Sequence, residues 1–303
     1  MLVLLGWKVA MVAKKRLPFE KIFVSLGVMV DFTRAASGMI TVANKPGRLD
    51  SIREAILEVV DKDLMGFREA LSIRGKITYA EGQLFSRVAA PACRILSKWA
   101  SEGNLRKLSE EMVFALKVGC EALLSAGPRV VLPVSLLPPV VVFTDGACEE
   151  SGTSIGGVIF DGVNRPEVFG AVLSRVVVES WYTKVGQKQV IGQAELLPLL
   201  VARVTWKNKL SGRRVLYFID NDSARLGLIK AYSPVLPSLV IISECLCWDH
   251  LNNSSSWFAR VPTESNIADD PSRMDSALLV EHYNARIVPP VAPEGCSFSS
   301  ILE

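Results

Sequence analysis

The sequence has few of the features that build membrane spans, disulfide frameworks or histidine metal sites. No apolar stretch reaches about 18 uninterrupted residues, so we expect no membrane-spanning helix. The apolar start has no basic residue ahead of it, which is the wrong order for a secretory signal. The six cysteines show no paired framework, and the single Cys245-x-Cys247 is weak as a zinc site. Two histidines, His250 and His282, are too few for a histidine-based metal site.

Length and charge point to two parts with different partners. With 303 residues, 50% of them hydrophobic, the chain is long enough for about two domains with buried cores, which excludes global disorder. Residues 1–135 carry 20 basic and 13 acidic side chains, whereas residues 136–303 carry 14 and 18. This asymmetry favours nucleic-acid contact in the first half and a carboxylate-rich function in the second. We expect an intracellular, reduced and soluble protein, cytoplasmic or nuclear, with no membrane partner.

Residues 50–125 have the pattern of helices. Apolar residues recur at helical spacing, as at Ile52, Ile56 and Val59. Basic residues that include Arg74 and Lys76 lie between these apolar positions, and they form either solvated helix faces or a nucleic-acid-binding surface. The pattern breaks near residue 128, where several prolines predict a stiff connector. We therefore expect a first region over residues 1–135, a second over 136–288 and a loose tail over 289–303.

The second region has the pattern of a mixed α/β domain. Runs 140–143, 155–160 and 168–173 predict an antiparallel meander, and the all-apolar run 215–219 predicts a central strand. A fifth strand is expected over 257–261. Helices are expected over 195–206, 223–230 and 235–251 and from near residue 266. This order describes a five-stranded mixed sheet with helices packed on it.

Acidic residues stand at the ends of these expected elements. Asp145 and Asp220 close apolar strands, Glu195 opens a helix, and Asp269 lies in the first turn of the last helix. Four carboxylates at one sheet edge would repel one another unless divalent cations lay among them. Hard cations such as Mg²⁺ prefer oxygen ligands, so these residue types predict a magnesium site.

Each acid also has an ordinary explanation. Asp145 in Thr-Asp-Gly-Ala is compatible with a simple turn, and Glu195 with an acid that the helix dipole favours. Asp269 follows Asn266 by three residues, as in a capping box. Asp222 is interpreted as a turn or N-cap residue. Asp220 is the hardest to explain in this way, because five apolar residues lead directly into it.

Four segments resemble, in order, the acidic motifs of the ribonuclease H domain of retroelement polyproteins. They are Phe143-Thr-Asp-Gly-Ala147, Ala194-Glu-Leu-Leu197, Ile219-Asp-Asn-Asp-Ser-Ala224 and Asn266-Ile-Ala-Asp-Asp-Pro-Ser-Arg273. The resemblance covers about residues 140–273 and implies a ribonuclease H-like fold. It also implies that two Mg²⁺ ions, or Mn²⁺ in their place, support cleavage of the RNA strand of an RNA–DNA hybrid. The resemblance assigns metal ligation to four residues, Asp145, Glu195, Asp220 and Asp269.

The N-terminal part resembles the end of the matching reverse transcriptase. Residues 25–32 resemble the strand after the polymerase palm, and residues 45–48 and 71–77 resemble its thumb and connection. The form of the last acidic motif resembles that of tyrosine-recombinase-encoding retroelements. The implied partners are an RNA–DNA hybrid and the polymerase portion of the same polyprotein.

The sequence departs from the family pattern at several places. No Tyr/Phe-x-Asp-Asp motif occurs, so we expect no DNA synthesis by this chain alone. Residues 257–267 contain no histidine, where many family members have one that helps product release. Pro198 would clash with the carbonyl of Ala194 unless the helix starts there. Asp270 beside Asp269 leaves the identity of the fourth ligand open.

Three interpretations follow. In the first, the chain is a two-metal ribonuclease H in which the small residues Gly146 and Ala147 let the phosphate backbone approach. Basic residues of the helices, Arg74 and Lys76 among them, would then bind the hybrid. In the second, it is an inactive retroelement fragment that binds nucleic acid without cleaving it. In the third, it is another nuclease or a transposase of the same fold that cuts duplex DNA.

Overall fold

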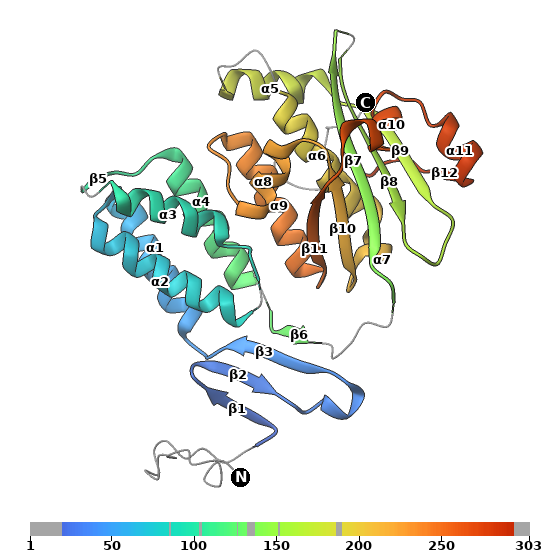
Figure 1. The fold of residues 1–303 in the computed structure, drawn as a ribbon. Helices are drawn as coiled ribbons and strands as arrows, with labels where there is room; N and C mark the ends of the chain where they lie inside the picture. Colours follow the sequence, from blue (N-terminus) through green and yellow to red (C-terminus); the bar gives the residue numbers. More distant parts are fainter. Residues whose placement is uncertain are drawn as a thin grey trace.

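The computed structural model describes residues 20–84, 86–102, 105–125, 127–131, 137–150, 152–185 and 190–293. The first part of the chain combines a small sheet with four helices (Figure 1). The helices, which confirm the helical prediction for residues 50–125, are α1 (Arg48–Lys62), α2 (Phe67–Gln83), α3 (Ala90–Ser101) and α4 (Glu110–Ser125). Between them, β4 (Leu64–Met65) pairs with β5 (Arg106–Lys107). The helices share one core because their apolar residues face inward at helical spacing, as at Ile52 and Ile56.

The small sheet has the order β1-β2-β3-β6. Its strands are β1 (Ile22–Ser25), β2 (Val28–Asp31), β3 (Ile40–Asn44) and β6 (Arg129–Val131). Residues 25–32 were expected to form one strand, but Leu26 and Gly27 both have positive φ and make a two-residue hairpin turn. Since β6 pairs with β3, the N-terminal region reaches at least Val131. The expected boundary at residue 135 lies outside the described residues and stays a prediction.

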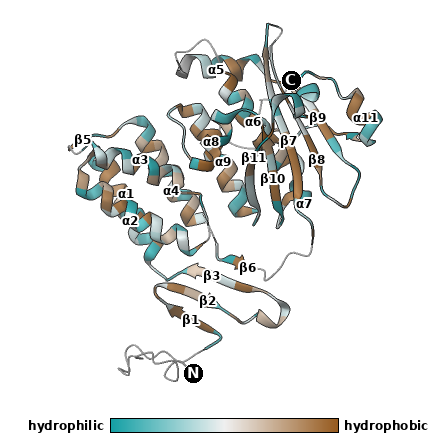
Figure 2. Cartoon of the chain, in the orientation of Figure 1, coloured by the Kyte–Doolittle hydropathy of each residue, from teal (hydrophilic) through white to brown (hydrophobic). Residues whose placement is uncertain are grey.

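The second part is a mixed sheet of order β11-β10-β7-β8-β9-β12, and it confirms the predicted mixed α/β class. Its strands are β7 (Val140–Glu149), β8 (Gly152–Phe160), β9 (Glu167–Val172), β10 (Arg214–Ile219), β11 (Ser255–Arg260) and β12 (Arg286–Ile287). β7, β8 and β9 form the antiparallel meander, and β10 runs parallel to both β7 and β11. Five strands were expected; the sixth, β12, adds two residues beside β9. Figure 2 shows β7 mostly in the hydrophobic colours.

Helices cover one face of this sheet and short elements cover part of the other. On the first face are α5 (Arg175–Val185), α6 (Ile191–Thr205), α7 (Lys207–Leu210), α8 (Asp222–Lys230) and α9 (Leu236–Leu251). The fully buried Arg203 of α6 pairs with Asp249 of α9 at 2.9 Å and lies over the ring of Tyr217 of β10. It thereby joins both helices to the sheet. On the other face, α10 (Asp269–Ser272) and α11 (Ala277–Tyr283) enclose a smaller cluster with β8 and β9.

Three expectations about the second region are corrected, and one unexpected helix is present. β7 continues past Asp145 to Glu149 because β8 pairs with it along its length. α6 begins at Ile191, so Glu195 lies inside the helix, and α5 was not expected at all. The described part of the tail, residues 289–293, is not loose: the Val291 amide donates to Thr205 Oγ1 at 2.9 Å. Residues 294–303 lie outside the described part. No described helix is long and apolar enough to cross a membrane.

Candidate metal centre

Three of the four predicted acids meet at one edge of the large sheet. Asp145 of β7, Glu195 of α6 and Asp220, directly after β10, each place a carboxylate oxygen within 4.8 Å of the others. The strand register explains this arrangement. Phe143 pairs with Phe218 across the parallel strands β7 and β10, and each acid follows its phenylalanine by two residues. Both side chains therefore emerge side by side at the same level of the sheet.

Glu195 reaches the cluster because α6 packs unusually close to β7. A Cβ added to Gly146 would lie 2.2 Å from the carbonyl oxygen of Ala194, so only glycine fits at this position. Pro198 lies inside α6 and has no N–H to offer that carbonyl. The helix does not end at the proline, and the Ala194 carbonyl, which has no amide donor four residues further on, faces Gly146 of β7.

Asp145 is 5% exposed and is held by residues from the last acidic segment. Ser272 Oγ donates to Asp145 Oδ2 at 2.6 Å, and Asn266 Nδ2 lies 3.4 Å from Oδ1. Burial raises the pKa of Asp145 above its ordinary value, and the nearby charges of Asp220 and Asp269 act in the same direction. The Ser272 hydrogen bond opposes this shift because it favours the ionised form.

Glu195 is 7% exposed, and burial raises its pKa to about 9, with further contributions from the charges of Asp145 and Asp220. Its Oε1 accepts from Asn221 Nδ2 at 3.5 Å. Glu195 Oε2 and Asp220 Oδ1 are buried without a hydrogen-bond partner among the described residues. Buried polar atoms normally have partners. Two orphaned oxygens in a crowd of carboxylates are what a hard divalent cation would satisfy, so the donor set fits Mg²⁺ or Mn²⁺.

Asp269, the fourth predicted ligand, lies beside the cluster rather than in it. Its carboxylate is paired with Arg273 at 3.3 Å, and Arg273 also pairs with Glu149. Asp269 is near enough for its charge to raise the pKa of Asp145. Asp270 is exposed. Between the two neighbouring acids, the structure therefore places Asp269 closer to the site.

The other predicted site residues have different surroundings from those expected. Gly146 faces α6, and Ala147 is 5% exposed, so their small size serves packing within the protein. Arg74 and Lys76 are exposed on α2. This exposure is compatible both with a nucleic-acid-binding surface and with an ordinary solvated helix face. Asp222 is not the N-cap of α8: Asn221 has that role, and Asp222 pairs with Arg225 and Arg260.

Sequence reasoning missed the residues that orient the acids. Ser272 and Asn221 were part of the quoted motifs, yet nothing in their one-dimensional pattern showed that they contact Asp145 and Glu195. Asn266 belongs to the last quoted motif as well, and its pattern suggested only a helix cap. These residues could have been found because they are polar and lie next to the acids in two motifs that are expected to meet at one sheet edge.

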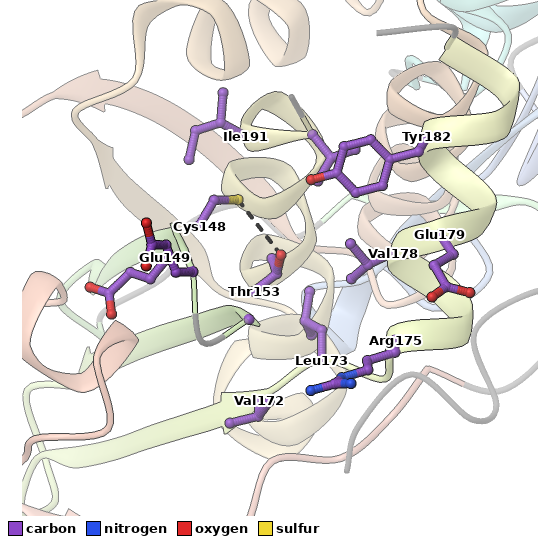
Figure 3. A pocket seen from close by; sticks show the side chains of 13 residues that line it. Cys148, Glu149, Thr153, Val172, Leu173, Arg175, Val178, Glu179, Tyr182 and Ile191 are labelled. Atoms are coloured by element: carbon purple, nitrogen blue, oxygen red, sulfur yellow. Dashed lines mark hydrogen bonds between the residues drawn. The ribbon is translucent and has the colours of Figure 1, made fainter. Parts of the chain in front are cut away.

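A cavity of about 720 Å³ lies between the β7–β8 hairpin and α5, and none of the three acids lines it (Figure 3). Cys148, three residues after Asp145 on β7, lies on its wall, and burial together with the charge of Glu195 raises the pKa of its thiol. The rim carries three glutamates (Glu149, Glu150, Glu179) and one arginine (Arg175). Since this rim is mainly acidic, a phosphate backbone is not drawn into the cavity.

Comparison with solved structures returns proteins of low identity. Ribonuclease H1 from the halophilic archaeon Halobacterium salinarum NRC-1 is 19% identical with a TM-score of 0.35, and the match covers 46% of this chain and 98% of that one. The N-terminal ribonuclease H domain of a Mycobacterium tuberculosis protein is 14% identical with a TM-score of 0.33, covering 47% and 96%.

The foamy viral protease-reverse transcriptase dRH, solved in complex with double-stranded DNA, is 15% identical with a TM-score of 0.29 and covers 80% of this chain and 38% of that one. No family model and no curated protein match the sequence. At TM-scores of 0.35 and below, these likenesses carry no argument about the function of this chain.

Proposed function

We propose that this chain is a divalent-cation-dependent nuclease that hydrolyses the RNA strand of RNA–DNA hybrids. The convergence of Asp145, Glu195 and Asp220 within 4.8 Å, with two orphaned buried oxygens, supports the proposal most strongly. Carboxylates so crowded and buried are unfavourable unless positive charge offsets their repulsion. A protein that needed these acids only for stability would pair them with basic side chains instead.

The three acids would hold the cations. When bound, two divalent ions would supply activation of the attacking water and stabilisation of the leaving oxygen. Asp145 is oriented by Ser272 and Asn266, and Glu195 by Asn221, so the acids are preset for ligation. In the reaction, the water oxygen bonds to phosphorus, the ester P–O bond of the RNA strand breaks, and the departing oxygen takes up a proton.

Exposed arginines flank the acids and would position the substrate. Arg260 is the last residue of β11 and pairs with Asp222, and Arg273 pairs with Asp269. Their side chains are 64% and 50% exposed, so phosphates can replace these carboxylate partners. Arg74 and Lys76 on α2 would add contacts to the hybrid backbone, and the affinity would then fall steeply with salt. Such contacts follow the shape of the hybrid rather than its base sequence.

The test is cleavage of labelled RNA–DNA hybrid, duplex DNA and duplex RNA with Mg²⁺. We expect cleavage of the hybrid, and we expect Asp145→Asn and Asp220→Asn each to reduce it on the order of 100-fold or more. Asp270→Asn is the matched control, because Asp270 is exposed and lies outside the cluster. Undiminished cleavage by Asp145→Asn would overturn the proposal. Cleavage of duplex DNA without RNA would instead favour another nuclease or a transposase of the same fold.

A second candidate function is hybrid binding without cleavage, as in an inactive retroelement fragment. The ion pair between Asp269 and Arg273 favours it, because the fourth predicted ligand is paired with an arginine and is not part of the cluster of three acids. Titration of Mg²⁺ or Mn²⁺ into the purified protein separates the two candidates. Hybrid binding with no saturable metal binding would favour the inactive fragment. The retroelement origin and the polymerase portion as partner remain predictions from the motifs.

A further inference from the structure

Helix α8 runs from the metal centre to the N-terminal helices. It begins at Asp222, two residues after Asp220, and ends at Lys230. At its far end, the side chains of Arg87 and Arg94 donate to carbonyl oxygens of its last turn. Arg87 Nη2 reaches the Leu228 and Ile229 carbonyls, and Arg94 Nε reaches the Lys230 carbonyl at 3.2 Å. A guanidinium at the C-terminus of a helix satisfies unpaired carbonyls and complements the helix dipole.

The first turn of α8 is tied to the acids by one side chain. Asn221 is the N-cap: its Oδ1 accepts from the Ala224 amide at 3.0 Å. The Nδ2 of the same side chain lies 3.5 Å from Glu195 Oε1. Asn221 also follows Asp220 directly. The position of α8 along its axis therefore decides where Asn221 lies, and Asn221 in turn contacts Glu195.

The connection between α8 and α9 is embedded in the N-terminal region. Leu239 of α9 is 0% exposed and belongs to the core of helices α1–α4, and Tyr232 and Leu236 pack against that core. Figure 1 shows this end of α8 and α9 facing the N-terminal helices. The contacts of Arg87 and Arg94 therefore lie at a packed interface between the two regions.

We propose that Arg87 and Arg94 are positioning residues for the carboxylate cluster. They fix the last turn of α8, α8 fixes Asn221, and Asn221 sets the orientation of Glu195 beside Asp220. The N-terminal helices are then a support for the metal centre in addition to any contact they make with nucleic acid. The consequence for metal binding rests on the proposed function, whereas the mechanical link through α8 does not.

The test uses the full chain with Arg87→Ala, Arg94→Ala, the double variant and the conservative Arg87→Lys. Arg53→Ala, on the exposed side of α1, is the matched control. Two quantities are measured: amide hydrogen exchange at Ala224, and the dissociation constant for Mn²⁺. We expect the double variant to exchange the Ala224 amide about tenfold faster and to bind Mn²⁺ about three- to tenfold more weakly. Arg87→Lys should recover part of both, and Arg53→Ala should change neither.

A double-mutant cycle tests the route. If coupling passes through Asn221, the arginine variants should have no further effect on Mn²⁺ affinity in an Asn221→Ala background. Faster exchange confined to the last turn of α8, with unchanged Ala224 exchange and Mn²⁺ affinity, would overturn the inference. If the wild-type chain bound no Mn²⁺, the proposed function would fail, and Ala224 exchange alone would still decide whether the arginines control the start of α8.

Discussion

At the scale of the residue, Glu81 is a buried carboxyl group in the N-terminal region, and its surroundings differ from those of the acids of the metal centre. Glu81 is 8% exposed at the end of α2, and its Oε1 accepts from the Ala89 amide at 2.7 Å. Burial raises its pKa to about 7, although the backbone amides of Ala89 and Ala90 and the charge of Arg87 act in the opposite direction. Unlike Glu195, whose Oε2 is buried without a partner among the described residues, Glu81 has no buried carboxylate oxygen without a hydrogen-bond partner, so its role is that of a cap for the chain entering α3.

Glu81 predicts a stability that falls as pH rises. Between its ordinary pKa of 4.5 and its folded value of about 7, the folded chain holds a proton that the unfolded chain has released. The contribution of Glu81 to the free energy of unfolding is therefore fully present below about pH 4.5. It decreases by roughly 3 kcal/mol as the pH rises to about 7. Glu81→Gln keeps the acceptor oxygen and removes this dependence. Melting temperatures from pH 4 to 8 check it, with exposed Glu121→Gln as control; equal slopes for Glu81→Gln and wild type would contradict it.

At the scale of the element, the periodicity of apolar residues predicted most of the strands and helices, but it predicted poorly where they begin and end. The runs 140–143 and 215–219 identified β7 and β10 because burial on both faces demands apolar residues. The end of β7 was missed because residues 145–149 contain no run of large apolar side chains, and their strand conformation is shown only by the pairing with β8. Helix α5 was missed because Val176, Val177 and Val178 favour strands, and the packing of Val177 and Val178 in the main core overrides that preference.

The candidate site was predictable to the same degree. Asp145 and Asp220 follow from strand patterns, and their juxtaposition follows from two parallel neighbours. The distance of Asp269 from the cluster depends on its pairing with Arg273 four residues later, which competes with ligation and has no periodic signal. The contact of Gly146 with α6 was likewise invisible, since a glycine after an aspartate is equally typical of a turn.

Gly146→Ala tests the close packing of β7 and α6. The added methyl group would overlap the Ala194 carbonyl, so α6 must shift and carry Glu195 with it. We expect a loss of roughly 1–3 kcal/mol in unfolding free energy and weaker Mn²⁺ binding. Gly192→Ala on the same helix meets no atom within 4 Å, and we expect it to be neutral or stabilising by about 0.5–1 kcal/mol. Chemical denaturation and metal titration measure both variants, and a harmless Gly146→Ala would refute the packing argument.

At the scale of the whole molecule, the two regions share side chains across their interface. Leu239 lies on α9 beside the large sheet and yet is buried among α1–α4. The predicted division into an N-terminal region and a second region therefore holds for the sequence. In the structure, the second region contributes a residue to the core of the N-terminal region. Regions joined in this way should lose their structure together.

Leu239→Ala tests that cooperativity. The cavity it leaves should lower the free energy of unfolding by about 2–5 kcal/mol. Leu239 lies on a helix of the second region and is buried in the core of the first. We therefore expect one calorimetric transition that moves as a whole to lower temperature. Leu226→Ala, at a position 38% exposed on α8, is the control and should have little effect. Two separate transitions, of which only one moved, would show that the regions unfold independently.

The hydrogen bond from Ser272 to Asp145 joins residues 127 positions apart in the chain. During synthesis, the strands and the helix that carry the three acids leave the ribosome well before residue 272 does. Until then, Asp145 lacks the hydroxyl group that holds it. The nascent protein therefore contains every acid of the cluster long before it contains the cluster in its final form. Cleavage competence, on the proposed function, would be acquired only after residue 272 has left the ribosome and reached Asp145.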